Sequence, residues 1–303
     1  MTAPEPWPAR RVGDRTVHPI GFGAMELTFP HTKTGELRVP VERAQAIRTV
    51  HAALDAGIRL IDTAINYAID ADEMGANEAL VAEALATWSG DSDDVLVVAK
   101  GGNRRDREQL FVHDGRPENL RWSCETSLAK LGVETIGLYI LHALDPAVPL
   151  AESIGALADL QREGKISMIG VSNFGRRQLA EARTIATISA VENQLSPFAR
   201  AATNLAHECA TEAIAFLAWS PMGGPLGPGG LRQRHPVIAR IADERGVSVQ
   251  RVALAWDLAQ SPNVIPIPSG NQPEFVADNA AAAELRLTDE EVAAINSFEP
   301  EPF

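Results

Sequence analysis

Residues 58–67, IRLIDTAINY, begin like a buried strand and then change character. The apolar run ends on Asp62, and Tyr67, one of only 2 tyrosines in the chain, follows five residues later. A carboxylate at the end of a core strand must be paired, solvated or neutralised. The meaning of this stretch therefore depends on which other polar residues end strands in the same way.

Seven further short apolar runs have the character of strands, and helix-like segments with apolar residues at three- and four-residue spacing separate most of them. Clear examples of such helices are 42–57, 150–165 and 237–261, the last of which we expect to break into two at Gly246-Val247. Strands that are apolar on both faces and alternate with helices predict a parallel sheet with crossover helices. With IRLID (58–62), the runs are HPIGFG (18–23), VLVVAK (95–100), IGLYIL (136–141), SMIGVS (167–172), SAVEN (189–193), AFLAWS (215–220) and VIPIPSG (264–270).

A count of eight strands favours a closed (β/α)8 TIM barrel of the α/β class over an open doubly wound sheet. An open dinucleotide-binding sheet needs G-x-G-x-x-G after its first strand, and the segment 21–26 lacks the third glycine. A barrel typically takes about 250 residues, so we expect a single domain over 1–303. RRVGDRTV (10–17) predicts a short N-terminal β-hairpin that covers the bottom of the barrel.

The composition narrows the class of protein. With 45% hydrophobic and 22% charged residues, the chain is expected to fold as a globular protein. A net charge of −13 argues against nucleic-acid binding, and no apolar run predicts a membrane span or a signal peptide. The only 2 cysteines, Cys124 and Cys209, form no metal-binding pattern, so we expect no metal and a cytoplasmic location. The sequence leaves the oligomeric state open.

Polar residues follow three neighbouring strands. Asp62 ends one strand, with Tyr67 in the loop after it, Lys100 ends the next, and His142 follows the one after that. Alone, each has an ordinary structural interpretation, as a turn cap, a solvated terminus or a hydrogen-bonded structural histidine. Because barrel enzymes place their chemistry at the C-terminal ends of the strands, the four together predict an active site.

Seven segments, spread over nearly the whole chain, carry a family resemblance: GFGAM (21–25), DTAINY (62–67), VVAK (97–100), SLAKLGVETIGLYILHALDP (127–146), LQREGKISMIGVSNF (160–174), AWSPMGG (218–224) and IPIPSG (265–270). With these segments the chain resembles the aldo-keto reductases. The resemblance implies a reductase that uses a nicotinamide cofactor and a tetrad formed by Asp62, Tyr67, Lys100 and His142.

The chemistry of carbonyl reduction agrees with that tetrad. Hydride delivery to carbon leaves charge on oxygen, which needs a proton donor and a hydrogen-bond donor. Tyr67 is expected to donate the proton, and an ammonium at Lys100 makes this proton easier to release. Asp62 is expected to pair with Lys100, and His142 to orient the carbonyl oxygen.

The resemblance also implies a cofactor site. It assigns the nicotinamide carboxamide to Ser172, Asn173 and Glu192, where the family usually has glutamine instead of Glu192. Asn173 as a helix cap and Trp219 as core packing are the competing interpretations. The full set of expected cofactor residues is Gly23, Met25, Asp62, Ser172, Asn173, Glu192, Trp219, Ser220, Pro221, Met222, Gly223, Ser269, Gly270, Asn271, Glu274 and Asn279.

The sequence predicts the choice between NADP(H) and NAD(H) less directly than it predicts the tetrad. NADP-preferring relatives often carry Lys or Arg where this chain has Ser269 and Phe275, so a phosphate contact would come from hydroxyl and amide donors or from Arg232 or Arg234. We expect NADP(H), with NAD(H) as the alternative. The substrate is expected to be a small aldehyde, ketone or alcohol, with pyridoxal-like and sugar-derived carbonyls as candidates.

Two other functions stay open. A barrel aldolase would use Lys100 as a Schiff base, which requires a lowered lysine pKa that a neighbouring Asp62 opposes. A non-catalytic protein that senses the nicotinamide cofactor would use the same fold, although an intact tetrad argues against it.

Overall fold

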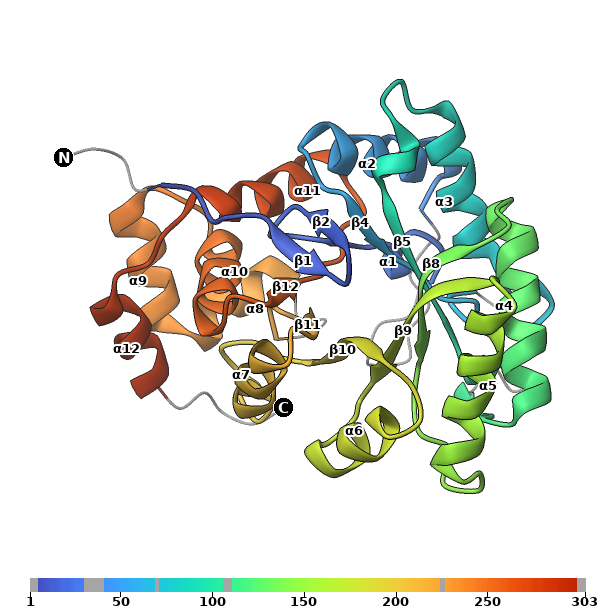
Figure 1. The fold of residues 1–303 in the computed structure, drawn as a ribbon. Helices are drawn as coiled ribbons and strands as arrows, with labels where there is room; N and C mark the ends of the chain where they lie inside the picture. Colours follow the sequence, from blue (N-terminus) through green and yellow to red (C-terminus); the bar gives the residue numbers. More distant parts are fainter. Residues whose placement is uncertain (1–4, 30–40, 69–70, 106–110, 224–226, 299–303) are drawn as a thin grey trace.

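Eight parallel strands, each hydrogen-bonded to the next, form the centre of the molecule (Figure 1). The computed structural model describes residues 5–29, 41–68, 71–105, 111–223 and 227–298. In spatial order the strands are β3 (Phe22–Gly23), β4 (Leu60–Asp62), β5 (Leu96–Gly101), β8 (Ile136–Leu141), β9 (Ile166–Ser172), β10 (Ile188–Gln194), β11 (Ala215–Trp219) and β12 (Val264–Pro266).

The first and last strands close the ring. Gly21 N–H donates to Pro266 O at 2.9 Å and Gly23 N–H to Pro268 O at 3.0 Å, and Gly23 forms a parallel bridge with Ser269. A Cβ on Gly21 would lie 2.9 Å from side-chain carbons of Ile267 and Leu60, and one on Gly23 would lie 2.9 Å from Ile267 O. Glycine is therefore required for this close backbone approach. The predicted (β/α)8 barrel is confirmed.

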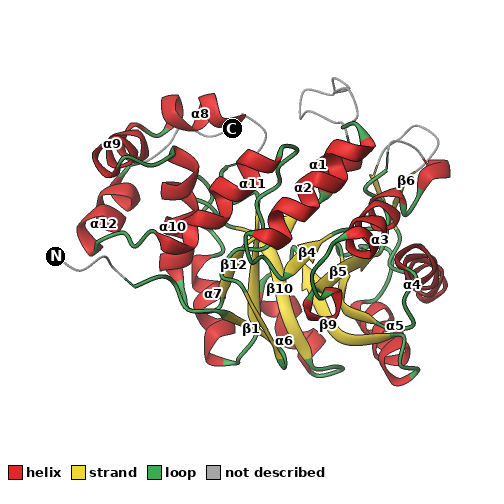
Figure 2. Cartoon of the chain, turned by 90° about the horizontal axis from the view of Figure 1, so that it is seen from above, coloured by secondary structure: helices red, strands yellow, loops and turns green. Residues whose placement is uncertain are grey.

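Helices connect successive strands and cover the outside of the barrel (Figure 2). The long helices expected at 42–57, 150–165 and 237–261 are present, and the last does break, because Gly246 at φ 65° ends α9 before Ser248 caps α10. The crossover helices are α2 (Arg43–Asp55), α3 (Ala76–Thr87), α4 (Pro117–Leu131), α5 (Leu150–Arg162), α6 (Arg176–Arg183), α7 (Thr203–Thr211), α8 (Gly227–Arg234), α9 (Pro236–Arg245) and α10 (Val249–Gln260). Outside this alternation lie α1 (Met25–Thr28), α11 (Pro273–Ala280) and α12 (Asp289–Ser297).

The N-terminal hairpin is also present. β1 (Arg10–Val12) and β2 (Arg15–Val17) pair antiparallel around Gly13, which has φ 57°. Val12 and Val17 are buried in the same apolar cluster as the barrel-interior residues Leu138 and Met168. The hairpin therefore seals the end of the barrel opposite to the C-terminal strand ends, as expected.

A second antiparallel hairpin was not expected. β6 (Asn103–Arg105) and β7 (Phe111–His113) pair directly after β5, on the side where the parallel strands end. No helix in the described part of the chain is both long and apolar enough to cross a bilayer.

Candidate active site

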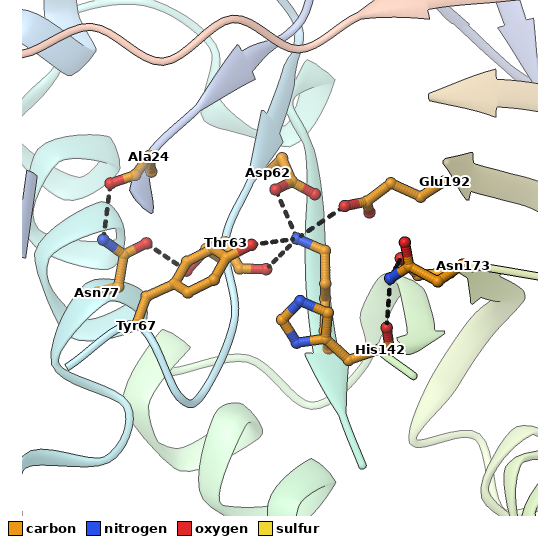
Figure 3. Close-up of polar contacts among 10 residues, drawn as sticks. Ala24, Asp62, Thr63, Tyr67, Asn77, His142, Asn173 and Glu192 are labelled. Atoms are coloured by element: carbon orange, nitrogen blue, oxygen red, sulfur yellow. Dashed lines mark hydrogen bonds and ion pairs between the residues drawn. The ribbon is translucent and has the colours of Figure 1, made fainter. Parts of the chain in front are cut away.

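Lys100 is the centre of a buried polar cluster at the C-terminal ends of the strands (Figure 3). Its Nζ donates to Asp62 Oδ1 at 2.5 Å, to Thr63 O at 3.1 Å and to the Tyr67 hydroxyl at 3.2 Å. Its exposed fraction is 0%, against 3% for Asp62 and 7% for Tyr67. The structure thus brings three of the four predicted tetrad residues into direct contact.

His142 is the fourth member of the group. Its backbone N–H donates to Gly101 O at 2.9 Å, which fixes its position after β8. Its ring lies edge-on to the Tyr67 ring, with 5.8 Å between centroids. Burial and the nearby Lys100 charge lower the pKa of His142 well below its usual value. The imidazole is therefore neutral, and its Nδ1 has no hydrogen-bond partner among the described residues.

The charge on Lys100 is set by two carboxylates. Burial alone opposes the ammonium, but Asp62 and Glu192 outweigh burial and raise the pKa of Lys100. Glu192 Oε1 lies 3.6 Å from Nζ. A Schiff-base lysine requires the opposite shift, so this environment argues against the aldolase alternative.

The acidity of Tyr67 departs from the expectation. Lys100 lowers the pKa of the phenol, as expected, but burial raises it by more, and the charges of Asp62 and Glu192 add to this rise. The net shift is upward. Lys100 by itself makes the Tyr67 proton easier to release, as expected. The site as a whole makes this proton harder to release, so the expectation of a more acidic Tyr67 is wrong.

Asn77, which the sequence reasoning missed, holds the backbone around Tyr67. Its side-chain amide donates to Ala24 O at 2.8 Å and to Thr28 Oγ1 at 2.7 Å, and its Oδ1 accepts from Thr63 Oγ1 at 2.6 Å. Thr28 Oγ1 in turn donates to Tyr67 O at 2.7 Å. These bonds join α1, α3 and the loop after β4 (Figure 3). The one sequence signal near Asn77 is Gly75, two residues earlier, which has φ 84° and caps the start of α3.

Ser172, Asn173 and Glu192 lie together at the ends of β9 and β10. Ser172 and Glu192 are register partners, and Asn173 N–H donates to Glu192 O at 3.1 Å. The Asn173 amide donates to Ser172 Oγ at 3.1 Å and to His142 O at 3.3 Å. Asn173 has φ 62° and does not cap α6, whose N-cap is Gly175. The helix-cap interpretation of Asn173 is therefore wrong.

Trp219 ends β11 and packs against the interior cluster, with its Nε1 unpartnered among the described residues. It leads into a tight turn in which Ser220 has φ 49° and Gly223 N–H donates to Ser220 O at 2.9 Å. Pro221 and Met222 lie inside this turn.

After this turn, residues 224–226 lie outside the described residues, and α8 begins at Gly227. Arg232 on this helix donates to both carboxylate oxygens of Asp243, at 2.7 and 3.0 Å, which weakens the suggestion that it binds a cofactor phosphate.

The last group of expected cofactor residues begins at Ser269, which lies beside Gly23 in the barrel closure. Gln45 on α2 donates to Asn271 O at 2.8 Å, which ties this segment to its neighbour. Asn279 is buried, whereas Glu274 and Phe275 in the first turn of α11 are exposed, Phe275 to 48%. Gly270 is buried, and Met25 lies half-buried at the start of α1.

A sequence model of the aldo/keto reductase family matches residues 19–300. The chain belongs to this family. Pyridoxine 4-dehydrogenase of Escherichia coli is 30% identical over 298 residues, which cover 96% of this chain and 98% of that protein. Among solved structures of aldo-keto reductases, the glycerol dehydrogenase of Gluconobacter oxydans superposes with a TM-score of 0.78 at 27% identity, covering 98% of this chain and 95% of that one. A Klebsiella pneumoniae aldo-keto reductase in complex with NADPH superposes with a TM-score of 0.77 at 27% identity, covering 97% and 96%.

Among the residues that the structure describes, no three His, Cys, Asp or Glu side chains are grouped as metal ligands would be.

Proposed function

We propose that the protein is an NADP(H)-dependent oxidoreductase that reduces a small aldehyde or ketone to the alcohol, with Tyr67 as the proton donor. The observation that carries this proposal is the contact of the Lys100 ammonium with both Asp62 and the Tyr67 hydroxyl in a buried site. A phenol beside a fixed ammonium is held ready to donate a proton to an oxygen on which negative charge develops.

The other residues of the site have complementary roles in this proposal. The neutral His142 imidazole acts as a hydrogen-bond donor to the carbonyl oxygen, which then lies between it and Tyr67. Asp62 keeps Lys100 charged and oriented. Asn77 fixes the loop that carries Tyr67, so that the hydroxyl keeps its position.

The residues along the ends of β9 to β12 fit a nicotinamide nucleotide. Trp219 Nε1 is a buried polar atom without a partner in the described structure, and Asn173 and Ser220 hold left-handed backbone conformations, a strain common at ligand sites. Ser172 and Asn173 would hold the carboxamide, Ser220 to Gly223 the pyrophosphate, and Ser269 to Asn279 the adenosine. When bound, the reduced nicotinamide supplies the hydride for the carbonyl carbon.

The relatives support the cofactor and the substrate class. One structural neighbour is a complex with NADPH, which favours NADP(H) here over the alternative NAD(H). Relatives named pyridoxine 4-dehydrogenase and glycerol dehydrogenase favour pyridoxal-like and sugar-derived carbonyls or the matching alcohols as substrates. Cys124 and Cys209 are buried and unpaired, which supports the cytoplasmic location expected from the sequence.

A panel of aldehydes and ketones, including pyridoxal and small sugar-derived carbonyls, tests the proposal. Each is incubated with the enzyme and either NADPH or NADH, and the loss of nicotinamide absorbance is followed. We expect carbonyl-dependent oxidation with a higher kcat/KM for NADPH. Binding of NADPH without turnover over the whole panel would favour the cofactor sensor, and a strong preference for NADH would overturn the cofactor assignment.

A further inference from the structure

Two buried carboxyl groups share one ammonium in this site. Asp62 Oδ1 lies 2.5 Å from Lys100 Nζ, and Glu192 Oε1 lies 3.6 Å from the same Nζ, next to Asp62 (Figure 3). Asp62 and Glu192 are each only 3% exposed. They come from β4 and β10, whereas Lys100 comes from β5, so the barrel itself holds the three charges together.

The charges in this cluster do not balance. If Asp62 and Glu192 were both ionised, the cluster would carry one uncompensated negative charge in a nearly dry site, which is costly. Asp62 Oδ2 and Glu192 Oε2 receive no N–H or O–H donor from the described residues. The two carboxyl groups lie within hydrogen-bonding reach of each other. A single proton between them removes the excess charge and supplies the missing donor, as in other carboxyl pairs that share a site.

On the adjacent strands, the register partners of Glu192 are Ser172 and Leu217, which are uncharged and do not replace this proton. Burial raises the pKa of Glu192 to about 8, the charge of Asp62 adds to the rise, and Lys100 opposes it. Burial likewise raises the pKa of Asp62.

The tetrad groups in this cluster, other than Asp62, keep their protonation state near neutral and mildly alkaline pH. The pKa values of Tyr67 and Lys100 are raised far above this range, and that of His142 is well below it. Glu78 on α3, which the Lys100 charge also influences, has a pKa raised to about 7 and is tested separately below. Within the cluster itself, the carboxyl pair is the group that loses a proton as the pH rises through about 8.

We propose that Glu192 is a positioning residue for proton transfer, which shares one proton with Asp62 beside Lys100 and whose ionisation weakens Tyr67 as a proton donor. This inference rests on the function proposed above. An ionised Glu192 places a second full negative charge near the Lys100 ammonium and offsets its pull on the phenolic proton, because the Glu192 charge raises the pKa of Tyr67. The shared proton is released to solvent, and no bond to carbon changes in this step.

The first test compares pH profiles of carbonyl reduction for the wild type and Glu192→Gln. For the wild type, kcat should fall about tenfold between about pH 7 and pH 9, the ratio of protonated fractions for a group that titrates near 8. In Glu192→Gln, which stays neutral, the fall should shrink to about twofold or less. A lower kcat at every pH with an unchanged profile would indicate a merely structural role and overturn the proposal.

Glu78→Gln is the matched control. Glu78 is also fully buried, with a pKa raised to about 7, but its carboxylate accepts a hydrogen bond from Ser127 on the outside of the barrel. This variant should keep the wild-type fall in kcat. If kcat of Glu78→Gln no longer decreased at alkaline pH, this decrease would be due to Glu78 and not to Glu192. That result would overturn the proposal.

The second test needs no turnover. Infrared spectra of the cofactor-free protein, recorded over a pH titration, report protonated carboxyl groups through their C=O stretch. A band that disappears with a midpoint near 8 should be present in the wild type and in Glu78→Gln, and absent from Glu192→Gln. Persistence of this band in Glu192→Gln would overturn the shared proton. If the wild type reduces no carbonyl, the proposed function and the effect on rate fail together, whereas the infrared titration still decides whether the proton is shared.

Discussion

The ammonium of Lys100 lies 3.2 Å from the hydroxyl oxygen of Tyr67, and both side chains are almost completely buried. In water such a pair would be worth little, but a dry site strengthens the interaction between charges and dipoles. The contact is held from the other side by Asp62, which accepts from the same Nζ at 2.5 Å. The acid–base chemistry of the site is therefore governed by the position of one lysine.

Replacing Tyr67 by phenylalanine tests the proton donor. Because general acid catalysis contributes about 10²–10⁴-fold, kcat for carbonyl reduction should fall by that order, while NADPH binding, followed by fluorescence titration, stays close to that of the wild type. The only other tyrosine, Tyr139, is fully buried on β8, and its hydroxyl has no partner among the described residues. Tyr139→Phe should therefore change kcat by no more than about twofold. Retention of most activity in Tyr67→Phe would exclude the assignment.

Replacing Asn77 by alanine tests the network that holds the Tyr67 loop. The change removes the partner of Ala24 O, Thr28 Oγ1 and Thr63 Oγ1, so we expect a loss of about 1–3 kcal/mol in the free energy of unfolding. We also expect kcat to fall about tenfold or more, because the hydroxyl of Tyr67 is no longer fixed. Urea unfolding and steady-state kinetics measure the two effects.

Asn119→Ala is the control for this experiment. The side-chain amide of Asn119, near the start of α4, donates a similar hydrogen bond to Asp114 O at 2.7 Å. It should lower stability and leave kcat unchanged. Equal losses of kcat in both variants would mean that general destabilisation, rather than the position of Tyr67, explains the effect of Asn77.

Replacing Phe275 by arginine tests the adenosine end. Phe275 is 48% exposed in the first turn of α11, where a guanidinium would be free to reach a 2′-phosphate. One charge-assisted bond should raise kcat/KM for NADPH about tenfold and leave that for NADH unchanged. Trp122→Arg, at an aromatic residue that is 47% exposed on α4, should change neither value. An equal change for both cofactors would place the 2′-phosphate elsewhere.

His235 predicts part of the acid sensitivity of the fold. It is fully buried, its ring nitrogen accepts from Ile238 N–H, and burial, helped by the charge of Arg200, lowers its pKa from 6.5 to about 4. Below pH 6.5 the unfolded chain therefore binds a proton that the folded chain refuses, and the free energy of unfolding falls as the pH drops toward about 4. This one group should contribute up to about 1.4 kcal/mol per pH unit.

Urea unfolding at several pH values checks this slope. His235→Asn keeps a helix-capping side chain and should reduce the dependence of the free energy of unfolding on pH by the contribution of about one proton. His207→Asn, at an exposed position, is the control and should leave this slope unchanged. An unchanged slope in His235→Asn would remove His235 from the explanation.

The sequence by itself determined the barrel and three of its polar strand ends. Eight apolar runs that alternate with helical patterns leave few other arrangements, since such strands must be covered on both faces. The C-terminal ends of parallel strands meet at one edge, which is why Asp62, Lys100 and His142 could be predicted as neighbours without coordinates. Gly21 and Gly23 were visible too, although only the closure against Ile267 explains them.

Tertiary structure alone decided the contacts that join distant segments. Glu192 is 92 residues from Lys100 in the sequence and 3.6 Å from it in space, and Asn77 joins Ala24, Thr28 and Thr63 across two elements. Burial, which sets the pKa values of Tyr67 and Glu192, exists only once the barrel has closed.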